Sequence, residues 1–181
     1  CFQSLLGEIS CHLALVYTLL EMDRVQEARQ HLDLRSEQLA GREETVLMSA
    51  WVSLAEQSAT PESLLASWTE KLERPEVNPL VRQLVGQLEG RAGDSSRAEV
   101  LLVQAARELW ESQDPFLRRN VARAYASAAR FGVSDSRAQY VEEALLLGSA
   151  DPLVLVELAL YFEAQGESRK AAEHMDLAAT L

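Results

Sequence analysis

The stretch that most constrains the fold is the last one, Asp151 to Leu181, because it shows a two-helix unit plainly. Asp151 followed by Pro152 predicts a helix start, since an aspartate caps orphan amides and proline tolerates the first helical position. Apolar residues then recur at helical spacing up to Gly166, and a second set follows it; the two sets are Leu155, Leu158, Ala159 and Phe162, then Ala171, Met175 and Ala178. We therefore expect two antiparallel helices joined by a glycine turn, with Leu158, Ala159, Phe162 and Ala171 buried.

The rest of the chain can be divided into weaker copies of this unit. The expected helix pairs cover approximately residues 2–39, 43–73, 78–111, 115–147 and 151–181, within a single domain spanning 1–181. Matching positions in the second helices are separated by 36, 34, 40 and 33 residues; they are Ala28, Leu64, Ala98, Ala138 and Ala171. No segment alternates β-branched and aromatic residues between turn residues, so the sequence predicts an all-α protein.

The fifth unit carries a positional pattern that is known from one repeat family. Counted from Pro152, bulky residues stand at places 4 and 7, a small one at 8, an aromatic at 11, glycine at 15 and alanine at 20. This resembles the tetratricopeptide repeat, whose period is about 34 residues. The resemblance implies a right-handed α-α superhelix of about five antiparallel helix pairs, with a concave groove that binds proteins. Another α-hairpin solenoid, or a compact helical domain, remains an alternative.

The charge balance argues against several classes of partner. Asp and Glu outnumber Lys and Arg by 28 to 17, giving a net charge of −11, whereas nucleic-acid binding depends on an excess of cations. All but two of the cations, Lys71 and Lys170, are arginines, which suit bidentate pairing with carboxylates. No apolar run approaches the roughly 20 residues of a membrane-spanning helix. We expect neither nucleic-acid binding nor a membrane span.

The sequence contains no recognisable catalytic or metal-binding constellation. The three histidines, His12, His31 and His174, are scattered, and the spacings of helical zinc sites are absent. No phosphate-binding loop or nucleophile elbow occurs either. We therefore expect a non-enzymatic protein that uses no metal or cofactor.

The tetratricopeptide resemblance also implies a binding surface, because places 2, 5, 9 and 12 of each first helix face the groove in that family. In the fourth unit, counted from Arg119, these are Asn120, Arg123, Ser127 and Arg130, and in the third they include Gln83 and Gln87. Amide, hydroxyl and guanidinium groups could hold an extended peptide or its carboxylates. The alternative is that Arg123 and Arg130 pair with acids on neighbouring helices.

Apolar residues in excess of the core pattern occur at both ends of the chain. In the fifth unit Val156 and Leu160 extend the apolar set, and we expect them to contact a second copy, a missing part of a longer chain, or a partner's helix. The main hypothesis is a protein-protein interaction module that binds a peptide or helix in the concave groove. The alternative is a structural or assembly domain of a larger bacterial envelope, pilus or polysaccharide-secretion protein. Such a domain could form a homo-oligomer.

The first residue bears on localisation. The chain begins with Cys1, so we expect a processed chain or a fragment of a longer one. A mature bacterial lipoprotein, anchored through Cys1, is a further possibility. A cytoplasmic and a bacterial periplasmic location therefore both stay open. Cys1 and Cys11 would lie roughly 15 Å apart on one helix, too far for a disulfide.

Overall fold

The computed structural model describes residues 15–16, 18–20, 22, 24–34, 43–56, 58–66, 68, 72, 77–113 and 115–181. The expectations for Cys1, Cys11 and most of the first helix therefore lie outside the described residues. The described part of the chain is all-α, and no strand occurs in it. Contacts divide the chain into two compact units, residues 1–67 and 68–181. The single domain expected from the sequence stays a prediction.

The first unit contains three helices within its described residues. They are α2 (Val25–Leu34), α4 (Glu43–Ala55) and α5 (Pro61–Leu65). α2 packs on α4, and Arg29 of α2 forms an ion pair of 2.7 Å with Glu56 just beyond α4. α5 opens with a capping box, because the Thr60 hydroxyl accepts from the Ser63 amide. It ends at Leu65, and most of the remaining residues of the expected pair 43–73 lie outside the described residues.

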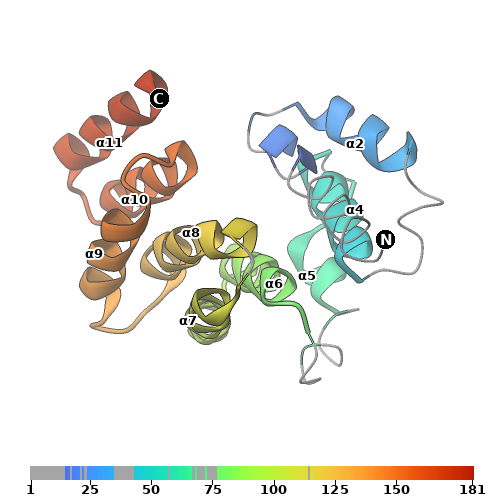
Figure 1. Cartoon of the computed structure of the whole chain (residues 1–181), viewed down its shortest axis with the longest axis horizontal. Helices are drawn as coiled ribbons and strands as arrows, with labels where there is room; N and C mark the ends of the chain where they lie inside the picture. Colours follow the sequence, from blue (N-terminus) through green and yellow to red (C-terminus); the bar gives the residue numbers. More distant parts are fainter. Residues whose placement is uncertain are drawn as a thin grey trace. The chain divides into compact units, whose positions relative to one another are not determined.

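The described residues of the second unit form six helices that follow one another in consecutive packing (Figure 1). They are α6 (Pro79–Ala92), α7 (Ser95–Glu111), α8 (Pro115–Phe131), α9 (Arg137–Gly148), α10 (Pro152–Ala164) and α11 (Ser168–Thr180). α6 packs on α7, α7 on α8, α8 on α9, and α10 on α11, while α8 also contacts α10. These pairs occupy the ranges that the sequence assigned to its third, fourth and fifth units.

Local signals set the ends of these helices. Asp151 accepts a hydrogen bond from the Leu153 amide with Pro152 in the first turn, as its sequence predicted. Gly93 and Gly166 have φ values of 96° and 77°, a left-handed conformation that favours glycine, and each lies in the turn between two paired helices. The chain can therefore reverse within two or three residues, which brings paired helices into contact.

In the core of the second unit, small side chains of α8 pack against large side chains of α10. One cluster places three alanines of α8 and Ala144 of α9 against α10; the α8 residues are Ala122, Ala126 and Ala129, and the α10 residues are Val154, Leu158 and Phe162. Leu158, Ala159 and Phe162 are buried as predicted. Ala171 is only partly buried, and Ala138, the expected second-helix marker of the fourth unit, is exposed because it lies in the first turn of α9.

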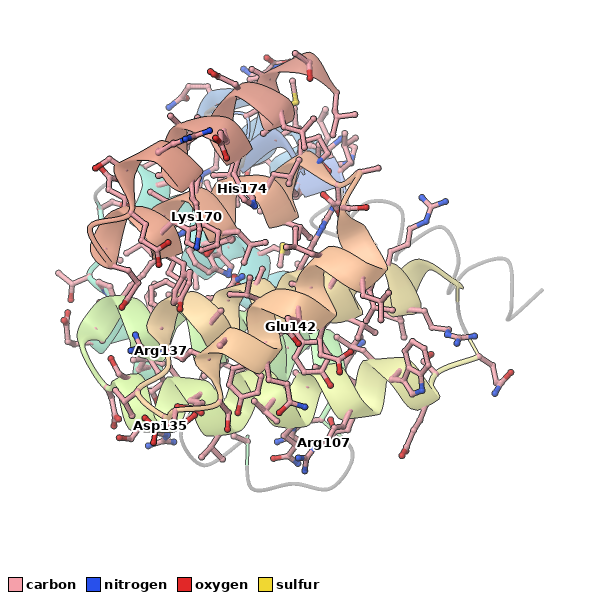
Figure 2. The ribbon with its side chains drawn as sticks, turned by 90° about the vertical axis from the view of Figure 1, so that its left-hand side faces the viewer. Arg107, Asp135, Arg137, Glu142, Lys170 and His174 are labelled. Carbon is pink, nitrogen blue, oxygen red and sulfur yellow. The ribbon has the colours of Figure 1, made fainter. Side chains whose placement is uncertain are left out.

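The last helix buries none of its residues fully. α11 contacts α10 through partly buried side chains, among them Ala171 and His174, whose ring lies 5.0 Å from the Phe162 ring. Lys170 extends over the same Phe162 ring at 5.1 Å. Figure 2 shows Lys170 and His174 on this helix. Met175, Leu177 and Leu181 remain 43–62% exposed, so this end of the second unit presents apolar side chains to solvent.

Candidate functional site

The two arginines expected to face a bound peptide are each paired with an acid on α10. Arg123 donates to both carboxylate oxygens of Asp151, at 2.8 and 3.3 Å, and Arg130 donates to Glu157 at 3.1 and 3.2 Å. The four side chains are 13–26% exposed. Both arginines therefore pair with acids on a neighbouring helix, which is the alternative that the sequence left open. They join α8 to α10, and their binding of a peptide stays a prediction.

The other four residues of the expected groove set are buried. Asn120, Ser127, Gln83 and Gln87 are at most 4% exposed, and their role in holding a peptide stays a prediction. The amide of Gln87 donates to the Ser127 hydroxyl at 2.8 Å and so joins α6 to α8. The Oε1 atom of Gln83 has no hydrogen-bond partner within the described part of the chain. Four of the six expected groove residues therefore join one first helix to another; they are Gln87, Ser127, Arg123 and Arg130.

The expected apolar contact residues, Val156 and Leu160, lie on the opposite side of α10 from its core face. Val154, Leu155 and Leu158 point into the core, and helical spacing places Leu153 beside Val156 and Leu160 on the other side. All three of these outward residues are partly exposed. α10 is therefore apolar on both sides, and its outward row borders the two ion pairs with α8.

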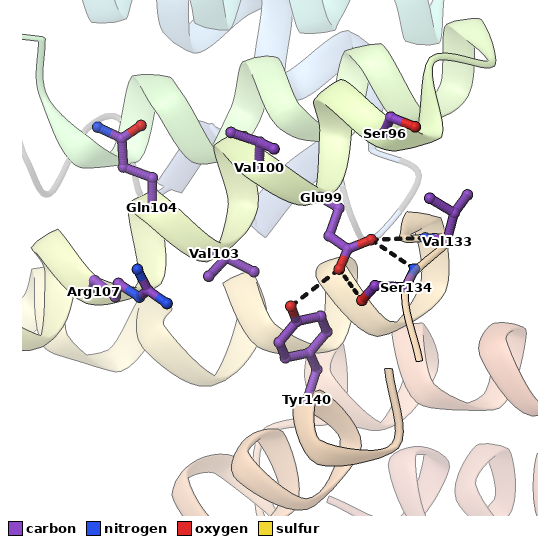
Figure 3. A pocket seen from close by; sticks show the side chains of 9 residues that line it. All are labelled: Ser96, Glu99, Val100, Val103, Gln104, Arg107, Val133, Ser134 and Tyr140. Carbon is purple, nitrogen blue, oxygen red and sulfur yellow. Dashed lines mark hydrogen bonds between the residues drawn. The ribbon is translucent and has the colours of Figure 1, made fainter. Parts of the chain in front are cut away.

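A pocket of about 570 Å³ opens on another face of the second unit, on the outer side of α7 (Figure 3). Six of its lining residues come from α7, two from the loop between α8 and α9, and one from α9; they are Ser96, Glu99, Val100, Val103, Gln104 and Arg107, then Val133 and Ser134, then Tyr140. Its volume falls within the roughly 300–1,000 Å³ of typical ligand pockets. No residue of this pocket was assigned a role from the sequence.

Glu99 holds one end of this pocket together. Its carboxylate accepts from the amides of Val133 and Ser134 at 2.8 and 2.9 Å, and from the Tyr140 hydroxyl at 3.1 Å. The Ser134 hydroxyl donates to the same carboxylate. Because the residue is only 8% exposed, these four donors replace the water that the charge would otherwise need. The carboxylate thus fastens the α8–α9 loop and α9 to α7.

The acidity of Glu99 reflects two opposing effects. Burial raises the pKa of its carboxyl group. The hydrogen bonds from Ser134, Val133 and Tyr140 lower this pKa, and together they outweigh the effect of burial. The net pKa lies below the usual value for glutamate, so the group is ionised at neutral pH. The same contact contributes to a raised pKa of Tyr140, for which burial is the larger cause. Tyr140 therefore stays a hydrogen-bond donor to the carboxylate.

Gly132 allows this loop to approach α7. A Cβ atom at this position would lie 2.9 Å from Glu99 Oε2 and 2.5 Å from the Ala128 carbonyl oxygen, closer than real Cβ contacts. The ring of Tyr140 stacks on Tyr125 of α8 with centroids 6.1 Å apart, which positions the phenol toward Glu99.

The rest of the pocket is apolar with one cation. Val100 and Val133 are 65% and 59% exposed, unusual values for valines, and Val103 lies between Val100 and Arg107 on the same side of α7. The sequence carries a weak signal here, since Val100 and Val103 lie off the core face made by Leu102, Ala105 and Leu109. Such off-face valines indicate an exposed apolar stripe.

The described residues contain no cluster of histidine, cysteine and acidic side chains that could hold a metal ion. In this same part of the chain, no helix has the length and hydropathy needed to cross a membrane. Comparison with protein-family models, with curated proteins and with solved structures found no match to this chain.

Proposed function

We propose that this chain is a non-enzymatic protein-protein interaction module, and that its second unit is a tetratricopeptide-like, right-handed superhelix. In this proposal the face formed by α8 and α10 is the concave groove, and it holds a peptide or helix from another protein. The consecutive packing of α6 to α11 supports a repeat architecture, because helix pairs that bury one side each must stack. Stacking of such pairs creates an extended surface along the first helices.

The observation that carries the proposal is the outward row of α10. Leu153, Val156 and Leu160 follow one side of the helix and remain partly exposed, although core burial would stabilise each by about 1.5–3 kcal/mol. The Arg123–Asp151 and Arg130–Glu157 pairs lie beside this row. An apolar centre with a charged rim is the usual anatomy of a protein interface. The spacing i, i+3 and i+7 is also the pattern with which one side of a helix packs against a partner's helix or apolar groove.

The test is affinity capture with wild-type protein and with the double variant Val156→Asp, Leu160→Asp. A matched control is Leu177→Asp on α11, which adds a carboxylate at a residue that is 46% exposed. We expect wild type and control to retain a common partner that the double variant loses, with identical helical circular dichroism for all three. Retention of the same partner by the double variant would contradict binding at this row.

A structural or assembly role is the second candidate, and the exposed end of α11 favours it. Met175, Leu177 and Leu181 are all at least 43% exposed on a helix that buries no residue fully. A second copy could cover them. Light scattering over a hundredfold range of protein concentration separates the two candidates. A monomer at every concentration contradicts self-assembly, whereas a dimer that Met175→Asp disperses would support it.

A further inference from the structure

The arginines of this acidic chain are mostly engaged, and Arg107 is an exception. Seven arginines in the described residues form ion pairs with acids; they are Arg24, Arg29, Arg82, Arg97, Arg123, Arg130 and Arg169. Arg118 and Arg137 lie over aromatic rings instead. Arg107 is exposed and has no hydrogen-bond, ion-pair or ring contact with any described residue. Because carboxylates outnumber cations by 28 to 17, an unpaired guanidinium is unexpected.

The acids of α7 nearest to Arg107 along the chain are Glu108 and Glu111, and neither forms an ion pair with it, although Glu111 is exposed one helical turn away. Glu108 accepts from Arg82 of α6 at 3.1 Å and from the Gln104 amide at 2.8 Å. Glu99, two turns earlier, accepts four hydrogen bonds from the α8–α9 loop and Tyr140. Glu99 therefore has its hydrogen-bonding capacity filled, and Glu108 already accepts from two donors. The exposed guanidinium of Arg107 is accessible to an acceptor from outside the chain, which would compete only with Glu111 on this helix.

The pocket that Arg107 lines has a defined polarity. Arg107 and Gln104 lie at one end of the row along α7, Glu99 and Ser134 lie at the other, and Val100 and Val103 lie between them (Figure 3). Eight residues of helix separate Arg107 from Glu99, or roughly 12 Å along the axis. Figure 2 shows Arg107 at the surface of the second unit. A ligand in this pocket would meet apolar walls along its length and a free cation at one end.

We propose that this outer pocket binds a ligand with an apolar body and one terminal carboxylate. The carboxylate accepts hydrogen bonds from Arg107, and the apolar body lies along Val100 and Val103 toward Val133. A guanidinium suits this role because it presents donors in a planar fork that matches a carboxylate. The saturated Glu99 carboxylate at the far end makes a second ligand acid unfavourable there. This site is separate from the α8–α10 face and goes beyond the function proposed for it.

Two sources could supply this chemistry, a fatty acid or the apolar C-terminus of a peptide. The probes are octanoate with octanol and octylamine as matched controls, and N-acetyl-leucyl-leucine with its C-terminal amide. Binding to the full chain is followed by chemical-shift changes of backbone amides during titration. We expect octanoate, the dipeptide or both to shift the amides of Val100, Val103 and Val133, and the neutral and cationic analogues to bind at least roughly tenfold more weakly. Tighter binding of octanoate would identify a fatty-acid site, and tighter binding of the dipeptide would identify a peptide C-terminus.

Arg107→Gln is the decisive variant, since this side chain has no hydrogen bond, ion pair or ring contact with a described residue and its loss should leave the helices intact. We expect it to weaken binding of the carboxylate probes by roughly tenfold and to remove their preference over the alcohol. Arg169→Gln removes an arginine that is 93% exposed on α11 and should leave binding unchanged. Val100→Asp, which adds a charge to the pocket wall, should abolish binding. Equal affinity of wild type and Arg107→Gln for octanoate and the dipeptide, or shifts confined to other residues, would overturn the proposal whatever the outcome at the α8–α10 face.

Discussion

Replacing Glu99 by alanine should destabilise the second unit more than the loss of an ordinary surface glutamate. The change removes an acceptor that serves two backbone amides and two hydroxyl groups. The hydroxyls of Ser134 and Tyr140 can turn toward the open pocket, but the amides of Val133 and Ser134 are fixed by the loop. An unsatisfied buried donor costs about 1–3 kcal/mol. Two such amides, partly rehydrated through the pocket, give an expected loss of about 3 kcal/mol.

For a chain of this length a loss of that size corresponds to a fall in Tm of roughly 6–12 °C. Thermal unfolding followed by circular dichroism measures it, with Glu142→Ala as the control because Glu142 is exposed on α9. Glu99→Gln keeps one acceptor oxygen for the amides and should lose only about 1 kcal/mol. A Tm of Glu99→Ala within 2 °C of wild type would show that the loop does not depend on this carboxylate.

The pH dependence gives an independent test of the same contact. The folded-state pKa of Glu99 is lowered, so its stabilisation is fully present above the unfolded-state value and is lost as pH falls through the folded-state value. Wild type should therefore lose more stability than Glu99→Gln when pH is lowered from 7 to below the ordinary glutamate pKa. The difference between the two proteins isolates Glu99, because all other carboxylates are common to both. A constant difference across this range would refute the lowered pKa.

Two further changes test neighbouring contacts. Gly132→Ala should cost about 1–3 kcal/mol in urea unfolding, because its Cβ would overlap Glu99 Oε2, and the cost should shrink in a Glu99→Ala background. Arg130→Glu should cost about 1–2 kcal/mol through repulsion from Glu157, a modest value because the pair is partly exposed, and Glu157→Arg in the same chain should restore stability. Additive losses in either double variant would show that the paired residues do not interact.

The helix pairs from residue 78 onward could be predicted because their limits depend on local chemistry. Asp151 with Pro152 and the glycines at 93 and 166 act within one turn of the chain, so sequence neighbours are sufficient to identify them. Ala138 was predicted to be the second-helix marker of the fourth unit, but it is exposed in the first turn of α9. The expected spacing fits an alanine at this exposed position as well as it fits a residue on the core face. The periodicity of apolar residues identifies the apolar face of a helix. Which residues of that face are buried depends on the helices packed against it.

The contacts between helices could not be predicted to the same degree. The sequence left two roles open for Arg123 and Arg130, and the choice depends on the offset between α8 and α10, which brings together residues 27 and 28 positions apart. The outer pocket needs α7, the α8–α9 loop and α9 at once, and Glu99 meets Tyr140 across 41 positions. Such distances are fixed by packing, so the residue pattern of one helix does not contain them.

The two proposed surfaces differ in how their charges are balanced, and this difference follows from the pairing of the arginines. Beside the α10 row Arg123 and Arg130 are each matched by an acid, so these two charges add little local field and a partner there gains affinity mainly from apolar burial. In the outer pocket Arg107 is unmatched, so a carboxylate gains a charge-assisted hydrogen bond as well as apolar contact. Dissolved salt weakens the attraction between exposed charges, which decays over about one Debye length, and more salt shortens that length. Added salt should therefore weaken a ligand at Arg107 and leave a partner on α10 almost unaffected, which places the two surfaces under different physical control within one stack of helices.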